Sequence, residues 1–248
     1  MAKRFNVASH TITLAEVDRI LSHVNDSTDS LIAEIMSTSQ NVMHEITIFN
    51  DARMGDNVLH AQQCLIFAIC SPQCKFDKNV RAANRMVVSL AKDFDSIDSV
   101  YQTLTANGTD SWVTAGMSAR AIFASLNFLR NVTDDDMSKS VLRAMRKVGQ
   151  VKGLGEKTMA MALALYDANN PVFTLDVHML RGLQSLSHGI IAGSMTINDN
   201  AYRALEDGMV AWHNVNMANY PIFLSQWALW NSFGFDGKHV SHLGILGA

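Results

Sequence analysis

One stretch of the chain, residues 151–181, restricts the possible folds more than any other. It reads VKGLGEKTMAMALALYDANNPVFTLDVHMLR, with two glycines in a tight turn, a run of good helix formers, and a second apolar segment that ends at an acid. Glycine permits the positive φ that a short turn between two helices can require. The backbone N–H groups at the N-terminus of the second helix then point in one direction and can hold a phosphate. The stretch therefore predicts a phosphate-binding helical hairpin at Gly153 and Gly155.

Two ionisable side chains follow this hairpin. Lys157 falls in the first turn of the second helix, where the helix dipole and partial burial disfavour the ammonium form and are expected to lower the lysine pKa. A neutral amine is a nucleophile. Asp176 comes 19 residues later, after the helix ends near residues 167–170 and the chain turns at Pro171. We expect the amine and the carboxylate to face one pocket.

Composition favours an all-α protein. The chain has 248 residues, of which 48% are hydrophobic and 17% charged, and only 3 are proline. That length suits one large domain or two small domains packed together. Alanine, leucine and methionine are frequent and no long β-type alternation occurs, so helices are the expected elements.

Helical periodicity divides the rest of the chain into segments. The pattern of residues 13–37 predicts one or two amphipathic helices. For residues 41–50 the sequence does not decide between a short extended piece and the end of a helix. Further helices are expected over 57–70, within 96–130, and over 199–213 and 219–233, with a loop over 188–199. Trp212, Trp227 and Trp230 are expected in the core, with the alternative that one of them faces a bound base.

Neither a membrane span nor a metal site is expected. No apolar run approaches about 18 residues, and the N-terminus lacks an apolar signal segment, which predicts a cytoplasmic protein. Cys64, Cys70 and Cys74 lack the paired spacing of a zinc site, and His239 and His242 lack a third ligand nearby. We interpret the thiols as reduced and structural, and we expect no metal and no cofactor.

The two halves of the 151–181 stretch together carry a family resemblance. G-L-G-E-K-T followed by L-D-V-H-M-L-R resembles the helix-hairpin-helix and Gly/Pro-Asp (HhH-GPD) signature of the base-excision DNA glycosylase superfamily. The resemblance implies that Lys157 and Asp176 are catalytic. It also implies that Gly153 and Gly155, preceded by Lys152, bind the DNA backbone.

The resemblance covers about residues 57–235 and implies a fold of two helical lobes within a single unit, 1–248. Residues 57–165 would form the central lobe, which contains the hairpin at 151–157, and residues 1–56 plus 166–248 the second lobe. Many relatives carry a four-cysteine iron–sulfur cluster after the aspartate, but no cysteine follows Cys74 here. Gln73 matches a loop position that reaches into the DNA stack beside an extruded base. The alternative for Gln73 is an exposed amide in a capping loop.

The overall charge does not favour DNA. Formal net charge is −3 and the isoelectric point is about 6.3, whereas duplex DNA is usually held by a basic surplus. Local binding is still possible, because Arg143, Arg146, Lys147 and Lys152 lead into the hairpin.

Three functions follow from these residues. The first resembles the branch of the superfamily that hypermodifies thymine in phage DNA, where an amino acid is transferred to phosphorylated 5-hydroxymethyluracil. The second is a bifunctional DNA glycosylase/AP lyase, in which Lys157 attacks C1′ and Asp176 stabilises the sugar cation. The third is a non-catalytic DNA-binding module. The expected partners are double-stranded DNA with an extruded base and, for the transferase, a free amino acid. The expected location is the cytoplasm, or the host cytoplasm if the protein is encoded by a phage.

Overall fold

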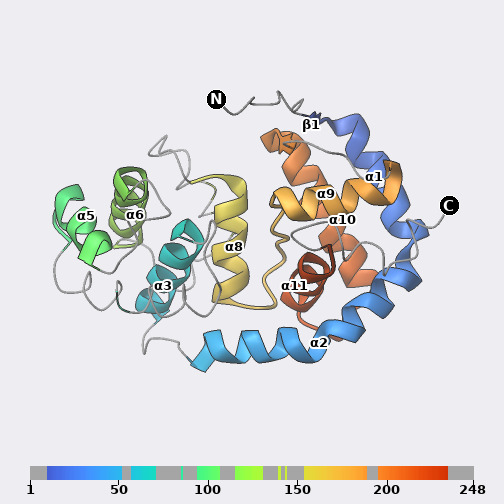
Figure 1. Cartoon of the computed structure of the whole chain (residues 1–248), viewed down its shortest axis with the longest axis horizontal. Helices are drawn as coiled ribbons and strands as arrows, with labels where there is room; N and C mark the ends of the chain where they lie inside the picture. Colours follow the sequence, from blue (N-terminus) through green and yellow to red (C-terminus); the bar gives the residue numbers. More distant parts are fainter. Residues whose placement is uncertain are drawn as a thin grey trace, which may run out of the picture. The chain divides into compact units, whose positions relative to one another are not determined.

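The computed structural model describes residues 10–51, 57–70, 85, 94–106, 115–130, 139, 140, 143, 154–188 and 195–233. These residues are mostly helical, which confirms the predicted class (Figure 1). The helices are α1 (Leu14–Asp26), α2 (Thr28–Asp51), α3 (Asn57–Cys70), α5 (Ile97–Ala106), α6 (Ala115–Leu129), α8 (Glu156–Tyr166), α9 (Val177–His188), α10 (Asp199–Asn216) and α11 (Ile222–Phe233). Two short strands, β1 (His10–Ile12) and β2 (Met195–Ile197), pair in parallel.

The chain divides into two compact units. One unit, called here the terminal unit, contains residues 1–43 and 171–248. The other, called the central unit, contains residues 44–170. One division falls inside α2, after Met43, and the other directly before Pro171.

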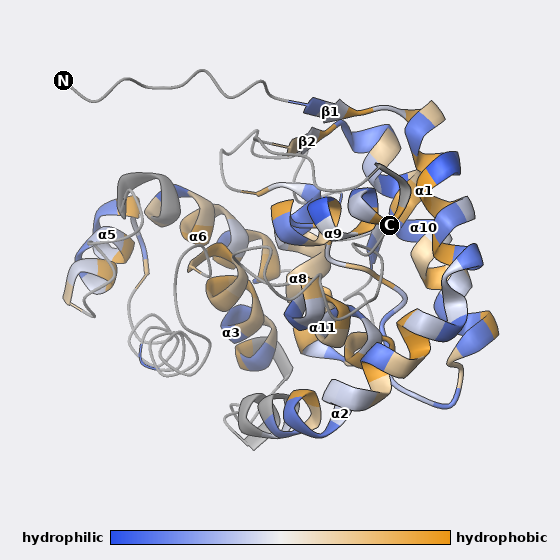
Figure 2. Cartoon of the chain, turned by 45° about the vertical axis from the view of Figure 1, so that its right-hand side comes forward, coloured by the Kyte–Doolittle hydropathy of each residue, from blue (hydrophilic) through white to orange (hydrophobic). Residues whose placement is uncertain are grey.

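In the terminal unit, α1 packs against α9 and α10, and α9 packs against α11. Val17, Ile20 and Val24 of α1 are buried at helical spacing, as expected of an amphipathic helix. Both α1 and α10 carry polar and apolar residues on different sides (Figure 2). The core of this unit therefore follows directly from the sequence pattern.

In the central unit, α3 is the most buried helix. Every residue from His60 to Cys70 is buried, since α8 and α6 both pack against α3. Polar residues of α3 consequently need partners inside the protein: His60 bonds Gln63 (Nδ1 to Oε1, 3.0 Å) and stacks on Tyr166 of α8 at a centroid distance of 5.4 Å. Cys64 and Cys70 are buried in α3, as predicted for core thiols, and Cys74 lies outside the described residues.

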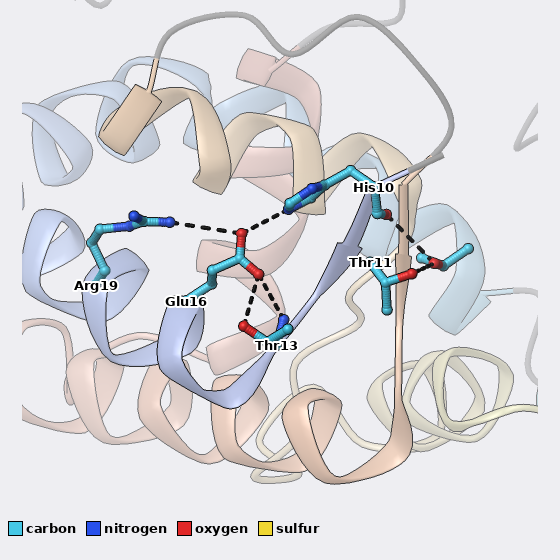
Figure 3. A network of polar contacts seen from close by, with 6 residues as sticks. His10, Thr11, Thr13, Glu16 and Arg19 are labelled. Atoms are coloured by element: carbon cyan, nitrogen blue, oxygen red, sulfur yellow. Dashed lines mark hydrogen bonds and ion pairs between the residues drawn. The ribbon is translucent and has the colours of Figure 1, made fainter. Parts of the chain in front are cut away.

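The structure refines three expectations. Residues 13–37 form two helices that separate at Ser27, and residues 41–50 are helical as part of α2. Strand β2 lies within residues 188–199, which were expected to form a loop. Its partner β1 is 185 residues away in the sequence, with His10 opposite Met195, and the hydroxyls of Thr11 and Thr196 are 2.8 Å apart (Figure 3). A strand of three residues has too little alternation to be recognised from sequence.

Candidate active site

The predicted site residues fall in different parts of the chain. Gln73, Lys152 and Gly153 lie outside the described residues. Gly155 and Lys157 belong to the central unit, at the start of α8. Asp176 belongs to the terminal unit, directly before α9. Each part is therefore described within its own unit.

Gly155 is the N-cap of α8, and its backbone corrects the expectation of positive φ. Its φ is −95° and its ψ is 171°, an extended conformation that any residue adopts. The Gly155 carbonyl accepts the first helical hydrogen bond from Met159 N at 3.1 Å. A Cβ at this position would meet no atom within 4 Å. Glycine here leaves open space in front of a helix N-terminus rather than relieving backbone strain.

Lys157 is the second residue of α8, in the first turn as the sequence predicts, and its side chain is partly exposed. Its neighbour Glu156 is buried and pairs with Arg143, with 2.9 Å between Nε and Oε2. Arg143 is one of the cations expected to support DNA binding near the hairpin, but this contact uses its charge inside the protein. Breaking a buried pair leaves one charge uncompensated, so Glu156 and Arg143 depend on each other.

An extended segment, residues 172–176, leads to Asp176 and is held by side chains instead of a neighbouring strand. Phe173 N donates to Glu206 Oε1 (3.3 Å), and Tyr202 Oη donates to Phe173 O (3.3 Å) while accepting from Leu175 N (3.1 Å). Thr174 N donates to Gln226 Oε1 (2.8 Å).

These bonds alternate between two helices. Residues 173 and 175 bond to α10, and residue 174 bonds to α11, which is the alternation of backbone polar groups along an extended chain. Tyr202, Glu206 and Gln226 are all buried. Because buried backbone N–H groups must be paired, these three side chains fix the path of the segment that ends at Asp176.

The Asp176 carboxylate is held at both oxygens. Oδ1 accepts from the backbone N–H groups of His178 (2.9 Å) and Met179 (2.8 Å), the N-cap arrangement for α9. Oδ2 accepts from the indole Nε1 of Trp230 at 2.8 Å. All three donors are neutral, and within the parts of the chain that are described no cationic side chain pairs with this carboxylate. Asp176 is partly exposed, so its negative charge is oriented and open to a ligand.

Aromatic rings continue from Asp176 into the core along α11. Trp230 stacks on Trp227 (centroids 5.6 Å), and Trp227 packs against Phe223 (5.3 Å). His178 meets Trp230 edge to face at 6.1 Å. Trp227 and Trp212 are buried, as expected, whereas Trp230 is partly exposed and bonds to the carboxylate.

Sequence reasoning missed three residues that support this site, Tyr202, Glu206 and Gln226, and it placed Trp230 in the core or against a base without predicting its bond to Asp176. A signal was available in their spacing. Tyr202 and Glu206 are four apart on α10, and Gln226 and Trp230 are four apart on α11, so each pair lies on one helix face. In α11, which is otherwise mostly apolar, such a pair indicates a buried polar partner, whereas α10 carries many polar residues and gives a weaker signal.

In the described part of the chain, no three metal-ligating side chains come together. None of the helices described has the length and apolar character needed to cross a bilayer. Comparison with protein-family models, with curated protein sequences and with solved structures gave no match.

Proposed function

We propose that the chain is a DNA base-modifying enzyme with a helix-hairpin-helix glycosylase fold, and that Asp176 is its reactive carboxylate. The observation that supports this proposal is the state of that carboxylate: three neutral N–H donors orient it, it is partly exposed, and no described cation neutralises it. A structural cap needs only the two bonds to His178 and Met179. The third bond, from Trp230, fixes the second oxygen as a reacting group requires.

The reaction we propose is transfer of an amino acid to phosphorylated 5-hydroxymethyluracil in phage DNA. The amine nitrogen forms a bond to the 5-methylene carbon, and the carbon–oxygen bond to the phosphate breaks, with the electron pair leaving on the phosphate. Asp176 accepts the proton that the nitrogen loses. Lys157 supplies the positive charge that balances the departing phosphate. The substrates are double-stranded DNA with an extruded base and a free amino acid, and the enzyme works in the cytoplasm of the host cell.

The glycosylase/AP lyase is the second candidate, and the position of Lys157 favours it. Lys157 is partly exposed in the first turn of α8, behind a glycine cap with open space around it. In this reaction the Lys157 amine forms a bond to C1′ while the glycosidic bond breaks and the base leaves with the electron pair, and Asp176 stabilises the positive charge on the sugar. Loss of a proton from the nitrogen and opening of the sugar ring then give the Schiff base.

One pair of assays separates the two reactions. Borohydride trapping is carried out on duplexes that contain uracil, 8-oxoguanine, 5-hydroxymethyluracil or an abasic site, with wild type and Lys157→Ala. Transfer of labelled amino acids is measured on duplex DNA that contains phosphorylated 5-hydroxymethyluracil. The proposal expects transfer without a trapped covalent band. A band that requires Lys157 would establish the lyase instead.

Asp176→Asn tests the carboxylate in either reaction. Asparagine keeps an oxygen acceptor for the α9 cap but sets its NH2 group against the Trp230 N–H, so helix content should be kept while the melting temperature falls modestly. Turnover should fall by about 100-fold or more because the base is lost. Asn198→Asp is the matched control, because Asn198 caps α10 by accepting from Ala201 N at 2.9 Å. Full turnover by Asp176→Asn would remove Asp176 from the mechanism.

A further inference from the structure

The hydroxyl of Thr174 is the unexplained polar group near Asp176. Its Oγ1 is inaccessible to solvent and has no hydrogen-bond partner among the described residues, and the residue as a whole is 8% exposed. A buried hydroxyl without a partner costs free energy, and few occur in native proteins. Thr174 is fixed by its backbone, through the bond to Gln226, and not by its side chain.

Thr174 and Asp176 share one face of the extended segment. The alternating bonds to α10 and α11 establish the extended path, and side chains two residues apart on such a path point to the same side. At a rise of about 3.3 Å per residue, their Cα atoms are about 6.6 Å apart. One small group can therefore contact both side chains.

The Thr174 hydroxyl is also able to turn. Rotation about χ1 moves Oγ1 into another of the staggered positions on Cβ. Because Oγ1 makes no hydrogen bond, that rotation breaks none. Contact between this hydroxyl and a ligand therefore requires a χ1 rotation, which loses no hydrogen bond.

The chemistry of this face selects a cation. An ionised carboxylate accepts about four hydrogen bonds, and Asp176 already accepts three, of which one is at Oδ2, so acceptor capacity remains at Oδ2. The Thr174 hydroxyl adds a second acceptor. A primary ammonium carries three N–H donors and one positive charge, and a nitrogen placed between two oxygens spans about 5.6 Å. It supplies both the missing countercharge and the missing partner.

We propose that Thr174 and Asp176 form the binding site for the amine co-substrate, which binds as a primary ammonium before DNA is engaged. The inference rests on the proposed function, because it names the site for the amine in the transfer reaction. Both side chains belong to the terminal unit, so this unit contains the whole amine site. After binding, the ammonium transfers one proton to Asp176 and becomes the neutral amine nucleophile. After attack the product nitrogen keeps its two remaining protons as a secondary ammonium, so Asp176 accepts one proton in total.

Calorimetric titration of the full chain without DNA tests the site. The probes are n-butylamine and free amino acids, with their N-acetylated forms as controls that lack the ammonium. Saturable binding of the amines is expected, and acetylation should abolish it. Asp176→Asn should weaken binding by about 10-fold or more, since a charge-assisted bond is lost. Thr174→Val should weaken binding by about fivefold and Thr174→Ser should restore it.

A stability measurement separates this role from a structural one. Thr174→Val removes no hydrogen bond of the free protein, so its melting temperature should equal or exceed that of wild type. Absence of amine binding by wild type, equal binding of acetylated probes, or unchanged binding by Thr174→Val would each overturn the inference. Amine binding without transfer to phosphorylated 5-hydroxymethyluracil would overturn the proposed function and leave the amine site standing. Transfer that does not depend on Thr174 would overturn the amine site and leave the proposed function standing.

Discussion

At the scale of single residues, the Asp176 carboxylate is held by groups from two different helices. Its Oδ1 caps α9 through two backbone N–H groups, while its Oδ2 meets the side chain of Trp230, 54 residues further along the chain. The cap sets where the carboxylate lies, and the indole sets how it is turned. The orientation of Oδ2 thus depends on a residue of another helix.

Trp230→Phe should reduce turnover while the fold is kept. Phenylalanine retains most of the ring but removes the N–H that bonds Oδ2, and a hydrogen bond to a charged group contributes about 1.5–3 kcal/mol. We expect a decrease in kcat of about 10-fold or more with little change in KM for DNA. Steady-state kinetics measure this, and Trp227→Phe is the matched control on the same helix. Equal losses in the two variants would contradict a specific role for the Trp230 N–H.

At the scale of elements, close approach of helices depends on two glycines. A Cβ on Gly182 of α9 would overlap the ring of Phe233 at the end of α11, near its attachment to the side chain. A Cβ on Gly208 of α10 would overlap both methyl groups of Leu21 on α1 and lie 3.0 Å from its Cγ. The ring has to move as a whole, whereas a leucine end can rotate, so the two contacts differ in cost.

Gly182→Ala and Gly208→Ala should therefore differ in stability. Alanine gains about 1 kcal/mol over glycine in a helix, which offsets a small rearrangement of Leu21, so Gly208→Ala should be close to neutral. Gly182→Ala should lower the free energy of unfolding by about 1–3 kcal/mol, because the α9 and α11 helices have to separate. Urea unfolding followed by tryptophan fluorescence compares them. A neutral Gly182→Ala would show that Phe233 is free to move.

At the scale of the whole molecule, the terminal unit joins the two ends of the chain. β1 pairs with β2, and the hydroxyl of Ser232 in α11 donates to Glu34 Oε1 in α2 at 2.7 Å, across 198 residues. Residues 44–170 form their own unit between these ends. The early helices of the terminal unit therefore complete their core only when the last helices are present.

Two side chains of the terminal unit make its stability sensitive to acid. Burial alone would raise the pKa of Glu16, but hydrogen bonds from the N–H and O–H of Thr13 and the contact with His10 outweigh burial and lower that pKa below its usual 4.5 (Figure 3). For His213, burial lowers the pKa below its usual 6.5, against a smaller opposing effect of the bond to Tyr220 O.

In both cases the unfolded chain binds more protons than the folded chain at pH values between the folded-state and unfolded-state pKa of the group, so the free energy of unfolding rises with pH in that range.

The contribution of His213 to the free energy of unfolding should be complete above about pH 6.5 and be lost as the pH falls below that value. The contribution of Glu16 should be lost below about pH 4.5. Urea unfolding between pH 7.5 and pH 3.5 measures this, in a Trp112→Phe background so that fluorescence reports the terminal unit. His213→Gln should flatten the upper part of the profile, and Glu16→Gln the lower part. A profile that neither variant changes would assign the acid sensitivity to other groups.

Local sequence patterns were sufficient to predict the helical class, most of the helices and the position of Lys157 in the first turn of α8, because helix formers, caps and apolar periodicity act over a few neighbouring residues. They did not determine the β1–β2 pair, the pairing of Arg143 with Glu156 or the φ of Gly155. These depend on residues that are distant in the chain, or on the turn that is actually formed.

The surroundings of Asp176 show the same division most clearly. The D-V-H pattern marked the acid, and its N-cap position is a local property. Only the tertiary structure brought Trp230 to the second oxygen and left the Thr174 hydroxyl buried without a partner. Hydrogen bonds between segments 50 or more residues apart are decided by how α9, α10 and α11 pack, and local sequence carries no information on that packing.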